Sequence, residues 1–493
     1  MENPVVTLLQ KTVLAHGDKA ALLQDEKSLS YNELFRSIKR YAGLLKGNGL
    51  GDGDRVVIAM PDCPEFICAF LGCLYAGLVP VPVNDSLGRS LFEYILNDSE
   101  AKAVFTVAEC AASQTESAAL KRRYLLGDAG FLSELAKASY TTPPAPYSES
   151  TIGYMLYTSG STGFPKGVPH YGKNILPQVN RYGDEVLHVS ADDVLFSVSK
   201  LFFAYGLLNT ITYALGYGAT SILMYEKPYP AKIKQILIEK RPTILFAVPS
   251  VHSMLIEEAA AVLQGGSVRL AVSAGETLSA PLCTLFQEKT GVEILDGFGS
   301  TEVGHIVLSN FPGEVSPGRT GRPVPPWQVR LLDTKGREVP DGHPGSINLS
   351  GPMLLPYYWK DRGKSPSVID WFDTGDMFVR EEGGYRYVGR SNEMFKCDGN
   401  WVSPVQVEKI IESHPAIKEC GVTGRKLVGT IRPFAYVVLN SGYTGSLRLE
   451  TELTNFARKT LAPSMCPVGY IFCKALPRTE TGKVQRFKLL EIQ

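Results

Sequence analysis

The stretch from Tyr157 to His170, YTSGSTGFPKGVPH, contains the residue types that bind phosphate groups. Glycines let backbone N–H groups turn toward an anion, and hydroxyl side chains add further donors. A Walker loop would need GxxxxGK followed by Ser or Thr, but here Lys166 follows Pro165 and precedes Gly167. The stretch therefore favours a phosphate chemistry different from that of P-loop ATPases and GTPases. The alternative is a flexible polar turn. The candidate phosphate-binding residues are Thr158, Ser159, Gly160, Ser161, Thr162, Gly163 and Lys166.

The composition is that of a soluble globular protein. The chain has 493 residues, of which 44% are hydrophobic and 20% charged, and its formal net charge is zero. This length exceeds one ordinary hydrophobic core, so two or more domains are expected. The balanced charge gives no indication of a nucleic acid or a membrane surface as partner.

Cysteine usage and the termini predict a cytoplasmic protein. The nine cysteines form no CxxC pair, so the sequence does not support a zinc cluster. Their scatter is typical of reduced, buried thiols. The segment MENPVVTLLQKTV lacks the basic start and apolar run of a secretory signal, and LLEIQ is not a peroxisomal address.

One uncharged segment is long enough to raise the question of a membrane span. No charge occurs between Glu65 and Asp85, and a spanning helix needs only about 20 apolar residues. Gly72, Gly77 and two prolines interrupt the segment, and VPVPV is typical of a strand. A buried helix followed by a buried strand is the favoured interpretation, and no membrane partner is expected.

Helix and strand patterns alternate along most of the chain. LSYNELFRSIKRYAGLLKGNGL, PEFICAFLGCLYAG and AKIKQILIEK predict helices, whereas DRVVIAM, AVFTV and ILFAV predict short buried strands. Such alternation indicates parallel sheets covered by helices, which is the α/β fold class. Residues 312–390 form a β-rich stretch with many glycines and prolines, and SPVQVEKIIESHP then predicts a helix.

These patterns predict two domains. The larger, residues 1–390, has parallel-rich sheets flanked by helices plus a β-rich subdomain. About a hundred residues follow, enough for a small α+β domain, residues 391–493. The boundary is expected at Arg390–Ser391.

An ordered set of motifs resembles the adenylate-forming superfamily, which includes acyl- and aryl-CoA ligases, peptide-synthetase adenylation domains and luciferases. YTSGSTGFPKG is similar to the phosphate loop of that superfamily. The other motifs follow in the family's order over nearly the whole chain: LSYNEL, KLFFAYGLLN, VSAGE, DGFGSTE, WFDTGD, GRSNEMFK and PRTETGK. The resemblance implies two reactions. A carboxylate attacks the α-phosphate of ATP to give an acyl-AMP and pyrophosphate, and a thiol then attacks the acyl-AMP.

The resemblance also implies roles for the nucleotide site, where cations and donors must offset the repulsion between two anions. Glu302 is the expected Mg²⁺ ligand, and Thr301 is expected to hold a phosphate oxygen. Phe298 would stack on adenine, in a position where the family often has tyrosine. For each residue the alternative is a surface salt bridge or a core aromatic. The remaining nucleotide-binding candidates are Gly275, Glu276, Asp296, Gly297, Asp376 for the ribose hydroxyls, and Arg390 for ribose or phosphate.

The resemblance assigns the last catalytic role and the domain movement to the C-terminal part. Lys483, in RTETGKVQR, resembles the lysine that reaches the carboxylate and α-phosphate during adenylation. Asn392 stands at the hinge, where the family commonly has Asp or Lys, and Asn also tolerates unusual backbone angles. Gly399 would let the moving loop pass a pantetheine arm. Trp401 would either wall the thiol tunnel or be a buried structural residue.

The acid is expected to be aromatic. FFAYG has no acidic residue, so an α-amino acid would lack a counter-charge for its ammonium. Aromatic and small residues suggest a short, flat slot, and both informative segments resemble the benzoate-CoA ligase subgroup with its anthranilate-activating members. His305 would hydrogen-bond a ring substituent or orient the carboxylate, or be a satisfied core histidine. The expected slot residues are Ala204, Tyr205, Ala274, Gly299 and His305.

The acceptor and the catalytic nature of the protein each have an alternative. The thiol acceptor is expected to be coenzyme A, for whose phosphates Arg425, Lys426 and Arg432 are candidates, with the pantetheine arm of a carrier protein as the alternative. A binding protein without turnover is disfavoured because Lys483, Glu302 and Asp376 are all present. A nucleotide-dependent regulatory or motor ATPase would release ADP and phosphate instead of pyrophosphate.

Overall fold

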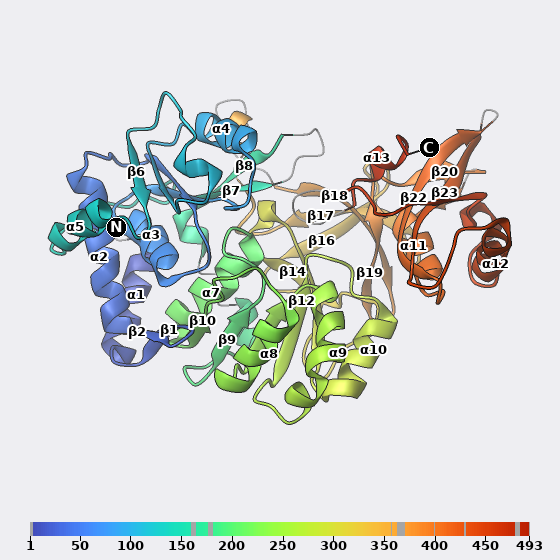
Figure 1. Ribbon diagram of the computed structural model, residues 1–493, viewed down its shortest axis with the longest axis horizontal. Helices are drawn as coiled ribbons and strands as arrows, with labels where there is room; N and C mark the ends of the chain where they lie inside the picture. Colours follow the sequence, from blue (N-terminus) through green and yellow to red (C-terminus); the bar gives the residue numbers. More distant parts are fainter. Residues whose placement is uncertain are drawn as a thin grey trace. The chain divides into compact units, whose positions relative to one another are not determined.

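The computed structural model describes residues 3–158, 164–175, 181–355, 357–361, 370–398, 400–427, 430–478 and 484–492 (Figure 1). The chain divides into two compact units. Unit 1 comprises Met1–Gln328 and Ser350–Phe372, and unit 2 comprises Val329–Leu349 and Asp373–Gln493. Both units combine helices and sheets, so the α/β class expected from the sequence is confirmed.

A four-stranded parallel sheet forms the first part of unit 1. Its order is β4-β3-β5-β6. The neighbouring helix α2 begins with a capping box. In it the Ser30 side chain accepts from Glu33 N, and the Glu33 carboxylate accepts from Ser30 N. The strands and neighbouring helices are β3 Arg55–Ala59, β4 Val79–Pro82, β5 Ala103–Thr106, β6 Arg122–Leu125, α2 Tyr31–Gly47, α3 Pro64–Tyr75, α4 Arg89–Asp98 and α5 Ala129–Lys137.

The uncharged segment forms α3 and β4, as expected. Every α3 residue from Phe66 to Tyr75 is buried, which explains why the helix shows no polar face. Among the described residues, no helix has both the length and the apolar character needed to cross a membrane.

A nine-stranded sheet forms the second part of unit 1, in the order β15-β14-β13-β12-β11-β9-β10-β1-β2. The six strands β13, β12, β11, β9, β10 and β1 run parallel to one another. At one edge β14 and β15 pair antiparallel, and at the other edge β2 pairs antiparallel with β1. Their bounds are β1 Ala20–Gln24, β2 Lys27–Ser30, β9 Val194–Ser197, β10 Thr220–Ile222, β11 Ile244–Ala247, β12 Leu270–Ala274, β13 Ile294–Gly299, β14 Ile306–Ser309 and β15 Arg322–Pro323.

Helices between these strands cover the sheet, as the predicted alternation requires. In Figure 1, α8, α9 and α10 lie next to one another beside the green and yellow strands. The helices are α1 Pro4–His16, α7 Ala204–Tyr217, α8 Pro230–Glu239, α9 Pro249–Gln264 and α10 Ala280–Thr290. A separate antiparallel hairpin consists of β7 Ile152–Thr158 and β8 Lys166–Tyr171.

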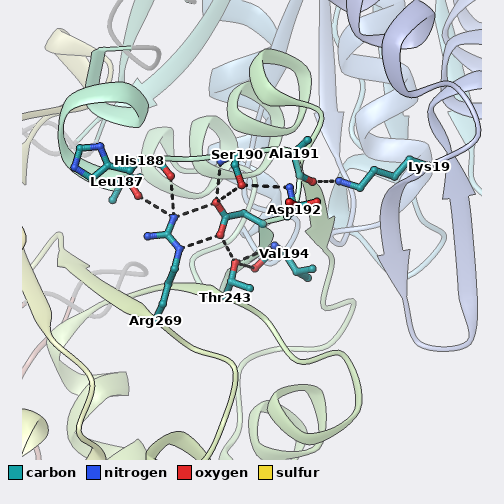
Figure 2. Close-up of polar contacts among 10 residues, drawn as sticks. Lys19, Leu187, His188, Ser190, Ala191, Asp192, Val194, Thr243 and Arg269 are labelled. Atoms are coloured by element: carbon teal, nitrogen blue, oxygen red, sulfur yellow. Dashed lines mark hydrogen bonds and ion pairs between the residues drawn. The ribbon is translucent and has the colours of Figure 1, made fainter.

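A buried carboxylate joins the amino ends of three neighbouring strands of the large sheet (Figure 2). Asp193, 4% exposed, precedes β9, Thr243 precedes β11 and Arg269 precedes β12. The Arg269 guanidinium donates to both Asp193 oxygens at 3.0 Å, and the Thr243 hydroxyl donates to Asp193 at 2.6 Å. Arg269 also donates to the carbonyls of Leu187 and His188.

Arg269→Ala is expected to lower the free energy of unfolding by about 2–3 kcal/mol at pH 7, because it leaves a buried carboxylate without its cation. Burial opposes ionisation of Asp193, but hydrogen bonds from Arg269 and Thr243 outweigh it and lower its pKa. A lowered pKa contributes stability above the unfolded-state value, and that stability is lost as the pH falls.

Chemical unfolding at pH 7 and pH 3 measures this effect. The difference in free energy of unfolding between the variant and the parent protein should be smaller at pH 3. Arg181→Ala, in an exposed pair with Glu185, is the matched control and should cost less than about 1 kcal/mol. Equal losses for the two variants at pH 7 would contradict the structural role of Asp193.

Unit 2 contains the β-rich stretch and the last hundred residues. Its sheets have the orders β16-β17-β18-β19, β20-β21 and β22-β23-β24. Its elements are β16 Gln328–Leu332, β17 Pro344–Ser350, β18 Phe372–Glu381, β19 Gly384–Arg390, β20 Phe395–Cys397, β21 Asn400–Val402, α11 Pro404–Glu412, β22 Ile417–Leu427, β23 Thr430–Leu439, α12 Leu447–Arg458, β24 Gly469–Phe472 and α13 Arg486–Leu489. The domain boundary expected at Arg390–Ser391, where the β-rich stretch ends, stays a prediction.

Candidate active site

Most candidate residues of unit 1 lie where the strands of the large sheet end. Ala274 ends β12, Gly299 ends β13, and Ala204 begins the helix that follows β9. Because β9, β11, β12 and β13 are parallel, their carboxyl ends meet at one edge of the sheet, which is where α/β sheets bind ligands. Gly299 pairs with Ile306 across the antiparallel turn, which brings His305 to the same edge.

The close approach at this edge explains why Gly299 is glycine. A Cβ on Gly299 would lie 2.1 Å from the His305 carbonyl oxygen. Gly275, directly after β12, has a φ of 90°, in the region that favours glycine. The adjacent Glu276 is exposed, and its carboxylate accepts from Ser250 N and Oγ at 3.2 Å.

Two neighbouring candidates differ in surroundings. The Asp296 side chain is buried inside the protein and accepts from the Thr320 hydroxyl at 2.8 Å, so it holds the fold together locally. Gly297 and Phe298 follow it on β13, and Phe298 is partly exposed at the carboxyl end of the strand. Phe298 therefore remains the adenine candidate, whereas the contact made by Asp296 is structural.

Two residues of the expected aromatic slot, Tyr205 and His305, lie in a cluster of packed rings. The ring centroids of Tyr182, Tyr213 and Tyr205 lie 5.5, 6.2 and 6.4 Å from that of His305. The Tyr205 hydroxyl donates to Val272 O at 3.0 Å. The rings contact one another, and burial, together with the nearby Asp296 carboxylate, raises the pKa of Tyr182 and Tyr205. A cluster of rings suits a flat aromatic ligand.

His305 is buried and neutral. It is 3% exposed, and burial lowers its pKa to about 3. Its Nε2 lies 3.0 Å from Asn209 Oδ1, an acceptor, so Nε2 carries the proton. Nδ1 is then an unprotonated acceptor, and it is buried without a hydrogen-bond partner among the described residues. Buried His252 likewise has an Nδ1 without a partner among the described residues, so the role of His305 in binding the acid stays a prediction.

Sequence reasoning missed Asn209. It ends the KLFFAYGLLN motif and lies four residues after Tyr205 on α7, which places both on one face of the helix. That helical spacing is the signal that would have found it.

Glu302 has a partner that the sequence did not predict. It lies in a short 3-10 turn, Thr301–Val303, and its Oε1 accepts from the Tyr358 hydroxyl at 3.1 Å. The Lys166 ammonium lies 5.1 Å from the centroid of the Tyr358 ring. Tyr358 thus connects two candidates that are 136 residues apart in the sequence, as their numbers show. Thr301 begins the turn and is partly exposed.

The β7–β8 hairpin fixes the ends of the candidate phosphate loop. Thr158 pairs with Lys166 across the hairpin. Helix α4 contacts both ends, because Asp98 accepts from the Tyr157 hydroxyl at 2.7 Å and Tyr94 stacks on Phe164 with centroids 4.8 Å apart. The candidates Ser159, Gly160, Ser161, Thr162 and Gly163 lie outside the described residues.

Unit 2 carries the remaining candidates. Asp376 is 2% exposed, and its Oδ1 lies 2.8 Å from Arg390 Nε. These two residues face each other across the β18–β19 ladder, and Asn392 follows in an exposed turn. Trp401 is 41% exposed, so the buried structural alternative for this residue is wrong.

The other two candidates of unit 2, Gly399 and Lys483, lie outside the described residues. The chain on both sides of the Lys483 segment is described. Arg478 and Val484 form a bridge, and Gln485 N donates to Pro477 O at 2.8 Å. The described residues that flank this segment are therefore held next to each other.

Two features indicate the class of protein to which the chain belongs: candidate residues at the carboxyl ends of the parallel strands, and the hairpin that carries the candidate phosphate loop. The model of the AMP-binding enzyme family matches residues 9–359, and that of the AMP-binding enzyme C-terminal domain matches residues 406–483. The chain is therefore a member of the AMP-binding enzyme family, and the expected superfamily is confirmed.

Individual relatives cover nearly the whole chain. A benzoate–CoA ligase of Thauera aromatica is 36% identical over 99% of this chain and 95% of its own length. The structure of a benzoate CoA ligase from Burkholderia xenovorans LB400 matches with a TM-score of 0.90 and 35% identity, covering 99% of this chain and 100% of that one. The structure of an anthranilate CoA ligase in complex with anthranoyl-AMP matches with a TM-score of 0.91 and 30% identity, covering 99% and 97%. The expected likeness to the benzoate- and anthranilate-CoA ligases is thus confirmed.

Proposed function

We propose that this enzyme activates an aromatic carboxylic acid with ATP, releasing pyrophosphate, and transfers the aryl group from aryl-AMP to coenzyme A. The observation that carries the proposal is the aromatic cluster around Tyr205 and His305, at the strand ends that also bear the candidate nucleotide residues. The likeness to benzoate– and anthranilate–CoA ligases over nearly the full length supports it. The enzyme is an AMP-forming acid–thiol ligase.

The two steps place different demands on the residues. In the first step a carboxylate oxygen attacks the α-phosphorus, a new P–O bond forms, and pyrophosphate leaves. The hydroxyls and amides near Thr158, the ammonium of Lys166 and the ammonium of Lys483 offset the repulsion between the two anions. In the second step the thiol sulfur, having lost its proton, attacks the acyl carbon, a thioester forms, and AMP leaves.

Glu302 is the proposed ligand of a magnesium ion. Among the described residues, no group of three or more His, Cys, Asp or Glu side chains could hold a metal. A single carboxylate suits Mg²⁺, which keeps waters and substrate phosphates as its other ligands. Tyr358 holds Oε1 of Glu302, and among the described residues Oε2 accepts no hydrogen bond, so the donor set fits. When bound, the ion would neutralise charge on the phosphates.

His305 supports a ring that carries a hydrogen-bond donor. Its Nδ1 is an acceptor, so it cannot hydrogen-bond an ionised carboxylate, whose oxygens are acceptors too. An amino or hydroxyl substituent would donate to Nδ1 and satisfy this buried atom. The substrate class is therefore aminobenzoate or hydroxybenzoate, with benzoate itself expected to bind more weakly.

Coenzyme A is the proposed acceptor because the relatives are CoA ligases by name. Of the cations considered for its phosphates, Arg432 is paired with Asp398 and Arg425 lies 5.2 Å from the centroid of the Phe434 ring, so the exposed Lys426 is the remaining candidate. The carrier-protein alternative has no comparable support. Mass detection of the thioester in reactions given CoA or a phosphopantetheinylated carrier protein separates the two, and exclusive loading of the carrier would refute CoA. The cytoplasmic location stays a prediction.

Ala204→Phe is expected to lower kcat/KM for benzoate-type acids at least about tenfold, because a filled core has no spare volume for a ring. Ala204 begins α7 next to Tyr205 and is partly buried. Acid-dependent pyrophosphate release measures the effect, with Ala204→Gly as the matched control that leaves the slot open. Unchanged turnover in Ala204→Phe would show that the acid binds elsewhere.

A further inference from the structure

Lys200 begins the segment KLFFAYG, and the proposed chemistry gives it no role. Its side chain is only 14% exposed, and its ammonium lies 3.6 Å from Asp62 Oδ2. The ammonium also donates to the carbonyl oxygens of Met224 and, at 2.6 Å, Glu226. A lysine ammonium has three donors. The third hydrogen bond goes to Tyr225 O at 3.5 Å, and Asp62 is the ion-pair partner just beyond hydrogen-bond distance. The partners of Lys200 are thus all inside the protein.

Asp62 holds the same segment from the other side. It is 5% exposed and lies between β3 and α3, in the part of unit 1 built on the smaller sheet. Its Oδ1 accepts from Leu201 N at 3.1 Å. Residues 200 and 201 are therefore fixed between the loop after β3 and the turn after β10. Burial raises the pKa of Asp62 to about 6, and the nearby Lys200 ammonium opposes this rise.

The first turn of α7 packs directly on the backbone of this segment. Phe203 N donates to Lys200 O at 3.1 Å, and a Cβ on Gly206 would lie 2.2 Å from the carbonyl oxygens of Ser199 and Lys200. Because backbone contacts backbone without a side chain between, a shift of Lys200 is transmitted to the turn that carries Ala204 and Tyr205.

We propose that Lys200 and Asp62 are positioning residues that fix the first turn of α7 and thereby set the affinity for the aromatic acid. This inference rests on the proposed function, which assigns Ala204 and Tyr205 to the acid slot. It predicts an effect specific to one substrate, because no hydrogen bond or ion pair joins a nucleotide candidate to Lys200 or Asp62 among the described residues. A small displacement of a substrate-positioning group costs up to about 10²-fold in rate.

Lys200→Met tests the proposal, because methionine keeps the length of the stem and removes the charge. The Michaelis constant for the aromatic acid should rise about tenfold or more, whereas that for ATP should change by less than about twofold. Lys200→Arg, which keeps a cation and its donors, should recover part of the affinity. Pyrophosphate release with each substrate varied in turn gives these constants.

Lys232→Met is the matched control. Lys232 is as buried as Lys200, with 12% of its side chain exposed, and it pairs with Asp25 and with Glu226 in the same turn. Lys232 makes no hydrogen bond or ion pair with residues 199–206 among those described. Its loss should therefore leave the Michaelis constant for the acid unchanged. Thermal unfolding of every variant records the structural cost.

Three results would overturn the proposal. The first is an unchanged Michaelis constant for the acid in Lys200→Met. The second is an equal rise in the Michaelis constants for the acid and for ATP in that variant. The third is a rise in the acid's Michaelis constant in Lys232→Met equal to that in Lys200→Met. If Lys200→Met does not fold, Asp62→Asn tests the proposal instead, because asparagine keeps an acceptor for Leu201 N but loses the charge. Asp62→Asn should raise the Michaelis constant for the acid several-fold. No rise in that constant would refute the proposal. If the parent enzyme releases no pyrophosphate with any aromatic acid, the proposed function itself fails, which is a separate outcome.

Discussion

Lys483→Ala is expected to abolish formation of aryl-AMP while transfer of a supplied aryl-AMP to CoA stays largely intact. In the proposed mechanism the ammonium would be a compact point charge next to the phosphorus at which negative charge develops, and it would take no part in thiol attack. Removing one preorganised donor of this kind costs about 10²–10³-fold in rate. Single-turnover assays of the two half-reactions, with ATP plus acid and with aryl-AMP plus CoA, measure the two rates separately.

The matched control for this prediction is Lys488→Ala. Lys488 lies five residues later on α13, is exposed, and has its ammonium 5.9 Å from the centroid of the Phe487 ring. It should leave both half-reactions unchanged. Equal loss of the two half-reactions in Lys483→Ala would contradict the assigned role, because it would indicate general damage to the small domain.

Glu302→Gln is expected to lower kcat/KM for the adenylation step by about 10²-fold and to raise the Mg²⁺ concentration needed for half-maximal activity. Glutamine has the shape of glutamate and still offers an oxygen to the Tyr358 hydroxyl, so the change removes mainly the negative charge that a hard cation prefers. A titration of activity against Mg²⁺, with chelator as the zero point, measures both effects.

Tyr358→Phe separates the charge of Glu302 from its orientation. It removes the hydroxyl that donates to Glu302 but keeps the ring near the Lys166 ammonium. A loss of less than about tenfold is expected, because both residues are partly exposed and water can replace the lost donor. The net contribution then falls below the about 1.5–3 kcal/mol typical of hydrogen bonds to a charged group. An unchanged Mg²⁺ dependence in Glu302→Gln would show that another group binds the metal.

Local patterns in the sequence predicted most of the fold. The helices over LSYNELFRSIKRYAG and PEFICAFLGCLYAG and the strands over DRVVIAM and ILFAV are α2, α3, β3 and β11. These elements bury complete faces, so their periodicity and their stop signals are strong. The order of the motifs predicted the superfamily, because each motif keeps its type and spacing wherever the chain folds it.

The contacts between distant segments were not predictable. Tyr358 reaches Glu302, Asp62 reaches Lys200, and neither pair is marked by any spacing in the sequence. The protonation of His305 follows from Asn209 Oδ1 and from burial, and burial depends on the assembled fold. The exposure of Trp401 likewise depends on what packs against it, so the sequence left both alternatives open.

Pyrophosphate release that depends on an aromatic acid is the most direct test of the account. The purified enzyme, given ATP and Mg²⁺, should release pyrophosphate with aminobenzoates, hydroxybenzoates and benzoate, and far more slowly with short fatty acids or α-amino acids. Mass analysis after addition of CoA should then detect the aryl-CoA. Release of phosphate and ADP in place of pyrophosphate, or no response to any aromatic acid in the series, would contradict the central claim.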